Sequence, residues 1–439
     1  MTADDGTVRG TPAGGAGATR DRNAIRAAVA EAHRREWAFV LAATARITRD
    51  LDAAEECVQD AYVAALDAWA RQGVPRNPAA WLTTAARHRA LDTLRRDKTL
   101  RAKLPLLIED QPAQPDGRGG DFPPGDDRLR LIFTCCHPAI AREAQVALTL
   151  RLVCGLSTAD IARAFLVSEP TMAARVTRAK KKISAAKIAY RVPGTAELPD
   201  RLDAVLTVVH LVFTVGHTAP VGPDLVREDL VDRAMRLAQM LRALMPDERE
   251  VAGLLGLLLI TDARRLTRTD AAGNLLLLED QDRSLWDAAK IARGAALVVE
   301  GLRRGRPGRF ALQGAIAAVH GEAPSYSATD WPQLLDLYDL LLRAWPSPVV
   351  ELNRAVVTSM VSGPEAALDD IARLEADGRL DGYHYLPATK ADLLRRLRRY
   401  AEAESAYRRA LELTENPPEK AFIERRINQV RELHYSDLP

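Results

Sequence analysis

One segment of the chain gathers positive charge on a single side of a helix. Read at about 100° per residue, the segment 171–183 has one face of polar and basic side chains: Thr171, Arg175, Arg178 and Lys182. The other face has apolar side chains that a core would bury: Met172, Val176, Ala179 and Ile183. The whole chain has Lys+Arg 61 against Asp+Glu 59, so any anion-binding surface must be a local patch. A row of cations of this kind suits a phosphate backbone.

The residues upstream predict how this helix is positioned. The stretch "LSTADIARAFLVSE" predicts a helix capped by Ser157, a short break, and a new helix with Pro170 in its first turn. This order is the helix-turn-helix arrangement, whose second helix enters a major groove. Arg175 or Arg178 would then reach base edges. A solvated helix face is the alternative for a basic run alone, and the scaffold helix before it favours DNA binding.

A second basic segment, "AARHRALDTLRRDKTLRAK", belongs to a helix that opens at Pro78. Its buried stripe is predicted to be Leu82, Ala86, Ala90 and Leu94. The exposed side joins an aromatic residue to polar and basic neighbours, as unstacked bases and their phosphates require. The predicted contact residues are Trp81, Thr84, His88, Arg95 and Arg96. A core position is the alternative for Trp81.

Helical periodicity runs through the chain with almost no strand pattern, so we predict an all-α protein. The predicted parts are a flexible tail (1–20), a helical module (21–98), a linker (99–125), a second helical module (126–190) and a large helical region (195–439). In the first module, Asp52 and Glu55 predict a capping box, and Gly73 predicts the end of that helix. In the second, Pro138 predicts the start of a helix.

The large C-terminal region has the residue spacing of a tetratricopeptide repeat near its end. Small and aromatic residues recur there at intervals that let two antiparallel helices pack closely: Tyr400, Ala403, Tyr407, Ala410 and Leu411. A degenerate copy is predicted at 347–378. Such grooves suit a protein or peptide partner, and Asn353 and Arg354 are the candidates for holding a peptide carboxylate or another anion.

The sequence thus combines two predicted nucleic-acid surfaces with a linker between them. This combination resembles the sigma-70 family, specifically its extracytoplasmic-function sigma factors. "AAEECVQDAYVAALDAW" is similar to the family's helix that grips the β′ clamp helices of core RNA polymerase, which implies contacts by Glu56, Gln59 and Asp60. "PAAWLTTAARHRALDTLRR" is similar to the segment that melts and reads the minus-ten element. The second module is similar to the domain that reads the minus-thirty-five element, and the family resemblance also implies the β flap as a partner.

The C-terminal region makes the sequence similar to one particular subgroup of these sigma factors. The run from Leu129 to Ile183, then "EDQDRSLWD" and "ELNRAV", is similar to the subgroup with a large tetratricopeptide-like extension. This resemblance implies that promoter DNA and core polymerase are the partners. It also implies that the extension contributes to control of initiation.

Other residue patterns point away from catalysis and cofactors. "TCCHP" places Cys135 beside Cys136, but adjacent thiols fit one tetrahedral metal poorly, so we predict no metal and no cofactor. No nucleophile and base pair or phosphate-binding glycine loop is present, so no enzyme is predicted. No apolar run is long enough to span a membrane, and the N-terminus lacks a signal peptide's apolar region, so we expect a cytoplasmic protein.

Two other functions fit parts of the sequence. A stand-alone helix-turn-helix regulator with a helical sensing domain would bind duplex DNA without polymerase. Alternatively, the C-terminal region would be an enzyme or a small-ligand receptor.

Overall fold

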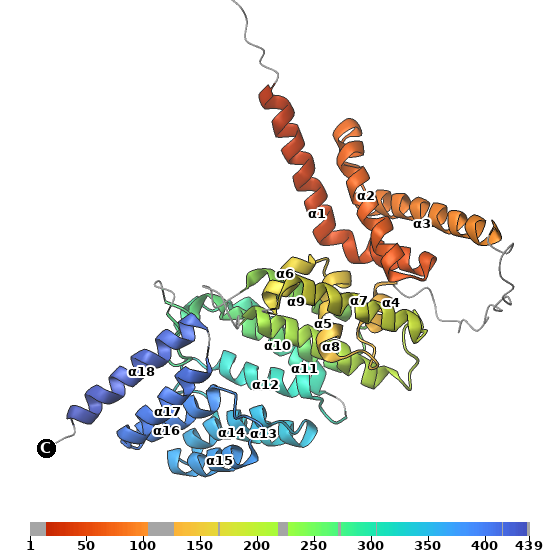
Figure 1. The fold of residues 1–439 in the computed structure, drawn as a ribbon. Helices are drawn as coiled ribbons and strands as arrows, with labels where there is room; N and C mark the ends of the chain where they lie inside the picture. The colour runs from red at the N-terminus through yellow and green to blue at the C-terminus, as the bar shows by residue number, and fades with distance from the viewer. Residues whose placement is uncertain are drawn as a thin grey trace, which may run out of the picture. The chain divides into compact units, whose positions relative to one another are not determined.

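The computed structural model describes residues 15–103, 127–165, 167–217, 227–270, 274–303, 305–414 and 416–436. These residues form helices and connecting turns, with a lone antiparallel bridge between Thr269 and Leu275 and no named strand among them. The prediction of an all-α fold is confirmed for these ranges. The chain divides into two compact units, Met1–Val205 and Leu206–Pro439, each described by itself below (Figure 1).

The first three helices form one helical core. They are α1 (Gly15–Thr48), α2 (Leu51–Gln72) and α3 (Pro78–Lys103). Helix α1 begins inside the segment predicted as a tail, and residues 1–14 lie outside the described ranges, as does most of the predicted linker (104–126). Val40, Leu41 and Val58 are fully buried between the helices. Their apolar spacing therefore places one face of each helix in a shared core.

The capping of α2 differs from the prediction. The cap is Asp50, whose carboxylate accepts the N–H of Ala53 at 2.8 Å. Glu55 is not part of a capping box, because its side chain is buried and faces two cations. The predicted end of the helix at Gly73 is confirmed, with a φ of 79° that favours glycine.

The second group of helices follows at residue 127. It consists of α4 (Asp127–Cys135), α5 (Arg142–Leu148), a π-helical turn (Thr149–Val153), α6 (Thr158–Ala164) and α7 (Glu169–Ala185). The helix predicted to open at Pro138 begins instead at Arg142, after a turn. It ends before Gly155, which has a φ of 68°, and a Cβ there would lie 3.0 Å from the Trp37 ring. Glycine is therefore required for both backbone conformation and space.

Helix α1 is hydrogen-bonded directly to this second group. The Trp37 indole Nε1 donates to the carbonyl of Leu152 at 3.0 Å. The Tyr190 hydroxyl donates to the carbonyl of Ala42, also at 3.0 Å. Both partner pairs lie more than 100 residues apart in sequence, so the two helical modules pack as parts of one unit.

The second unit begins within α8 (Leu198–His217) and continues through helices arranged in sequence. Its first part has α9 (Glu228–Leu244), α10 (Arg249–Ala263), α11 (Ala288–Leu302) and α12 (Arg309–Glu322). Helix α10 is buried almost all round, and small residues allow close approach on two sides. A Cβ on Gly256 would lie 2.7 Å from the carbonyl oxygen of Gly294 in α11, so the two helices pack nearly backbone to backbone.

In the rest of this unit, each helix packs against the next one along the chain (Figure 1). These helices are α13 (Trp331–Ala344), α14 (Pro348–Val361), α15 (Pro364–Asp377), α16 (Tyr385–Arg396), α17 (Tyr400–Leu413) and α18 (Pro417–Ser436). The predicted inward face of α17 is buried at Tyr400, Ala403, Tyr407 and Ala410. These side chains pack against α16 and α18 in one cluster. The tetratricopeptide assignment itself stays a prediction.

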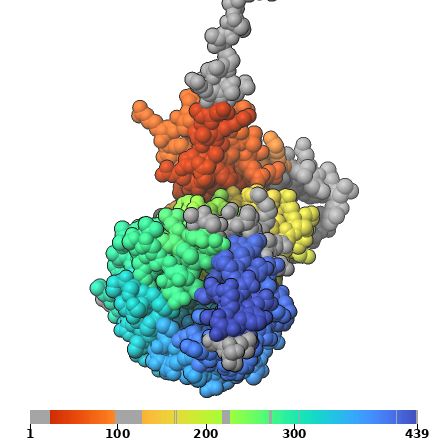
Figure 2. Space-filling view, turned by 90° about the vertical axis from the view of Figure 1, so that its left-hand side faces the viewer, coloured from red at the N-terminus to blue at the C-terminus, as the bar shows by residue number. Residues whose placement is uncertain are grey.

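The helices of the second unit form a continuous packed surface, which runs from green to blue in the space-filling view (Figure 2). Within the described ranges, no helix combines the length and the apolar character needed to cross a membrane.

Candidate nucleic-acid and polymerase interfaces

Helix α7 carries its charge as the sequence predicts. Ser168 caps its first turn by accepting the N–H of Thr171 at 3.3 Å. The four apolar positions are buried: Met172, Val176, Ala179 and Ile183. Opposite them, Thr171, Arg178 and Lys182 are exposed, and Arg175 is partly exposed. The three cations of this row make no ion pair with a described residue, so their charge is available to an external anion.

Lys180 is the exception on α7. Its Nζ lies 2.7 Å from Asp52 Oδ1 and 2.7 Å from Glu55 Oε2, both on helix α2. Arg151 pairs with the same Glu55. The side chains of Lys180 and Glu55 are only 9% and 7% exposed. Burial alone would lower the pKa of Lys180, but the charges and hydrogen bonds of Glu55 and Asp52 outweigh it and raise that pKa. This lysine therefore stabilises the fold and is not available to DNA.

Helix α3 presents a polar face beside a partly buried tryptophan. Thr84, His88, Arg95 and Arg96 are exposed. Trp81 is partly buried and packs edge-on against Trp69, with ring centroids 5.8 Å apart. The predicted inward stripe is fully buried at Leu82, Ala86 and Ala90. Trp81 is therefore neither a fully buried core residue nor a fully exposed one: its ring contacts Trp69, and the residue remains partly accessible.

The outer face of α2 carries the residues assigned to polymerase. Glu56, Gln59 and Asp60 are all exposed. Asp60 accepts a charged hydrogen bond from Arg89 at 2.8 Å, and Gln59 donates to Glu55 at 3.2 Å.

Two apolar residues continue this face. Val63 is 63% exposed and Leu66 is 38% exposed. They follow Gln59 at helical spacing, a signal that sequence analysis of the acidic and amide residues alone overlooks. Exposed apolar side chains beside polar ones are typical of a protein contact surface.

The cysteine pair is a core feature. Cys135 and Cys136 are fully buried, and the Cys136 thiol lies 3.5 Å from the Thr149 hydroxyl. Burial raises the pKa of Cys136 to about 11 and that of Cys135 as well, so both stay protonated. His137 uses its Nδ1 to accept the N–H of Ala139. Among the described residues, no group of three His, Cys, Asp or Glu side chains comes together to hold a metal ion.

The structure places the two predicted groove residues of the extension away from its cavity. Arg354 is ion-paired with Asp339 at 2.6 Å and with Asp370 at 3.6 Å. Asn353 is exposed, and neither residue lines the cavity of about 260 Å³ that the helices of the extension enclose. The charge of Arg354 is thus already compensated, which sequence analysis missed because Asp339 and Asp370 lie on other helices.

Comparison with known proteins agrees with this geometry. Residues 32–99 match the family described as Sigma-70 region 2, and residues 130–183 match the family described as Sigma-70, region 4. Residues 201–301 match a family of unknown function (DUF6596). An uncharacterized protein of Rhizobium meliloti (strain 1021) is 43% identical over 395 residues, which are 89% of this chain and 93% of the relative. The chain therefore belongs to the sigma-70 family, as a sigma factor of the extracytoplasmic-function type with a C-terminal extension.

Proposed function

We propose that this sigma factor reads the minus-thirty-five element with the exposed row of α7, namely Thr171, Arg175, Arg178 and Lys182. The observation that carries the proposal is that the three cations form no ion pair with any described residue, while the opposite side of their helix is buried. Arginine donates two hydrogen bonds to guanine in a major groove. Because these cations are not paired with a carboxylate of the described residues, no such ion pair has to break before they bind phosphate.

Core polymerase is held, in this proposal, by the outer face of α2. Glu56, Gln59 and Asp60 supply polar contacts to the β′ clamp helices, and Val63 and Leu66 supply the apolar part of the same surface. The support is that all five side chains are exposed on one helix, while another side of that helix, with Ala54, Val58, Ala61 and Ala65, is buried. The β flap is assigned to the second helical group by family resemblance alone.

The minus-ten element is assigned to the polar face of α3. Trp81 would stack on an unpaired base, while Arg95 and Arg96 would contact phosphates and Thr84 and His88 the base edges. The accessible part of the Trp81 ring supports this role, since a fully buried ring could not stack on DNA.

The C-terminal extension is proposed to control initiation through a ligand or a protein partner. Helix pairs packed in series leave concave faces that suit such binding. The cavity within α14 to α18 supports this role.

Transcription reconstituted from purified core polymerase and the full-length protein tests these roles. We expect Arg175→Ala to reduce initiation about tenfold or more at promoters with an upstream element, whereas Lys187→Ala, at an exposed lysine beyond α7, should leave it unchanged. Unchanged initiation and footprint with Arg175→Ala would reject the assignment of α7. Specific duplex binding by the protein without polymerase would favour a stand-alone regulator.

Binding to core polymerase is tested separately. The double variant Gln59→Ala and Asp60→Ala should weaken capture of core enzyme while the thermal unfolding of the protein stays close to wild type. Arg71→Ala, at an exposed position near the end of the same helix, is the matched control. Full retention of core binding by the double variant would remove α2 from the interface.

A further inference from the structure

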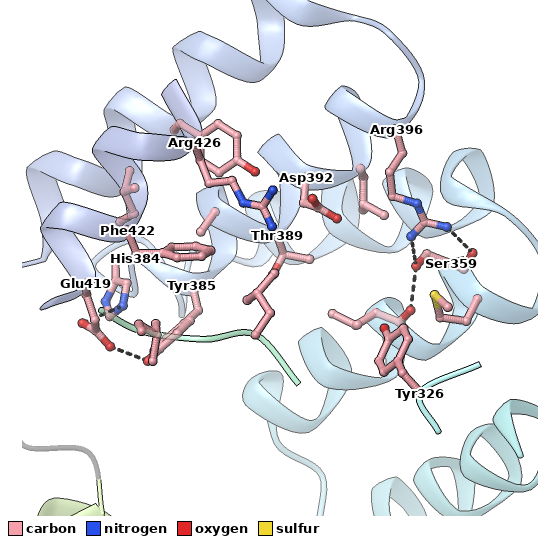
Figure 3. Close-up of a pocket in the computed structure, with 18 residues that line it drawn as sticks. Tyr326, Ser359, His384, Tyr385, Thr389, Asp392, Arg396, Glu419, Phe422 and Arg426 are labelled. Carbon is pink, nitrogen blue, oxygen red and sulfur yellow. Dashed lines mark hydrogen bonds and ion pairs between the residues drawn. The ribbon is translucent and has the colours of Figure 1, made fainter. Parts of the chain in front are cut away.

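The extension contains a cavity that the sequence does not reveal. Helices α14, α16, α17 and α18 and the segment 274–277 line it, and its volume is about 260 Å³ (Figure 3). Most of the wall is apolar: Leu275, Leu277, Val356, Met360, Phe422 and Ile423. The Arg425 guanidinium donates to the Asn274 side chain at 2.9 Å, which ties α18 to the segment that closes one side.

The two carboxylates of the cavity are already satisfied by protein groups. Asp392 accepts hydrogen bonds from Arg395 at 3.1 and 2.7 Å. Glu419 accepts the Tyr385 hydroxyl at 2.6 Å and the Thr414 hydroxyl at 2.9 Å, and the imidazole of His384 lies 3.3 Å away. Burial alone would raise the pKa of Glu419, but these contacts outweigh it and lower that pKa. Neither acid therefore needs a ligand cation.

Among the residues that the structure describes, the two arginines of the cavity have only neutral hydrogen-bond partners. Arg396 donates to the Ser359 hydroxyl at 2.8 Å and to the Ser359 carbonyl at 3.1 Å. Arg426 donates to the side-chain oxygen of Gln429 at 3.1 Å, and its guanidinium centre lies 5.3 Å from the Phe422 ring. No carboxylate of the described residues forms an ion pair with either guanidinium. In the close-up the two arginines lie on either side of Thr389 and Asp392, and Asp392 is paired with Arg395 (Figure 3).

This arrangement leaves positive charge uncompensated at the edge of an apolar space. Two guanidinium groups held by hydrogen bonds are preorganised for an anion, since little side-chain freedom remains to be lost on binding. The apolar wall would cover a hydrocarbon or aromatic group attached to that anion. The volume suits a small molecule and is too small for an extended peptide segment.

We propose that this cavity binds a small organic anion, with a carboxylate or phosphate group at Arg396 and Arg426 and an apolar body against Phe422, Leu275 and Leu277. This inference is independent of the proposed promoter roles. Ligand binding itself does not depend on the proposed control function, but an effect of the ligand on initiation would rest on it. Occupancy would join α14, α16 and α18 through one ligand and give the extension a chemical input.

Three compounds with one common body test the proposal: phenylbutyrate, phenylbutyl phosphate and phenylbutanol. Each is titrated calorimetrically into the full-length protein in the absence of polymerase. We expect at least one of the two anions to bind about tenfold more tightly than the alcohol, because hydrogen bonds to a charged group are worth more than those to a neutral one. The preferred anion distinguishes a carboxylate ligand from a phosphate ligand.

Substitutions locate the site. Arg396→Gln and Arg426→Gln should each remove the preference for the anion, and Ala388→Phe, which fills the cavity, should remove binding of all three compounds. Arg399→Gln is the control, because Arg399 pairs with Glu402 at the surface and does not line the cavity. Circular dichroism and thermal unfolding verify that each variant folds.

Three results would overturn the proposal: binding of both anions weaker than about 1 mM, equal affinity for the alcohol, or an anion preference that persists in folded arginine variants. Tighter binding of an acidic peptide than of either small anion would also replace the proposed occupant. None of these outcomes bears on promoter recognition, because the titration contains neither DNA nor polymerase.

Discussion

Helix α7 and the C-terminal extension differ in how their basic residues are compensated. On α7, Arg175, Arg178 and Lys182 form no ion pair with a described residue, whereas Lys180 is buried in ion pairs with α2. The proposed DNA contacts use the cations that no described carboxylate pairs. The paired lysine holds two helical groups together.

Several arginines of the extension are instead paired with carboxylates of the same unit. Arg265, for example, pairs with Asp262 at 2.6 Å, and Arg354 pairs with Asp339 at 2.6 Å. Arg396 and Arg426 at the cavity have neutral hydrogen-bond partners instead. The comparison teaches that a cation's availability depends on whether a carboxylate faces it in the fold, and residue type alone does not reveal this.

The largest expected effect comes from removing the unpaired cations of α7. The triple variant Arg175→Gln, Arg178→Gln and Lys182→Gln should weaken promoter binding by the holoenzyme about 100-fold or more. The slope of log K against the logarithm of the salt concentration should become less steep by about 2 to 3. Filter binding or fluorescence anisotropy across a salt series measures both quantities. An unchanged slope would show that these cations do not contact phosphates, and it would contradict the proposed role of α7 in binding DNA.

Two adjacent lysines of α7 provide a matched pair for stability. Lys180→Met should destabilise the first unit by about 2 to 3 kcal/mol, because it leaves the buried Glu55 with Arg151 alone. Lys181→Met, at an exposed lysine with no ion pair to a described residue, should change the free energy of unfolding by less than about 0.5 kcal/mol. Urea unfolding of both full-length variants checks the difference. Similar losses in the two variants would contradict the structural role of Lys180.

Acid should weaken the extension through a buried histidine. Burial together with Arg264 and Arg283 lowers the pKa of His320 to about 4. The folded state keeps His320 neutral, while the unfolded chain binds a proton below pH about 6.5, so its stabilising contribution is present above that pH and is lost as the pH falls toward 4. The loss is about 2 kcal/mol at pH 5.

His320→Gln removes this titration. Calorimetric unfolding at pH 7 and pH 5 should therefore show a smaller pH difference in the variant than in the wild-type protein. An identical difference would mean that the pKa of His320 is the same in the folded and unfolded states.

The smallest effect is expected at a paired arginine of the extension. Arg354→Gln should cost about 1 kcal/mol or less, since its partners are partly exposed, and it should leave transcription unchanged. Thermal unfolding and reconstituted transcription measure the two quantities. A strong transcription defect at unchanged stability would instead support the groove role that the sequence suggests for Asn353 and Arg354.

Local periodicity was enough to predict several features of this protein. The buried and exposed faces of α7, the buried stripe of α3 and the inward side of α17 agree with the structure, because helix geometry alone decides which residues share a face. The residues at 171–183 and 78–96 also carried the family resemblance. The start of the helix at Arg142 and the cap at Asp50 were missed, since turn and cap geometry depends on a few local hydrogen bonds.

Tertiary structure decided which charges are free. Lys180 and Lys182 are equally basic in sequence, yet only Lys180 faces Glu55, which lies 125 residues away. The cavity likewise exists because α18 meets the segment near Asn274, 151 residues before Arg425. A helical repeat specifies which side of a helix is buried, but the partner on that side is set by how distant helices pack.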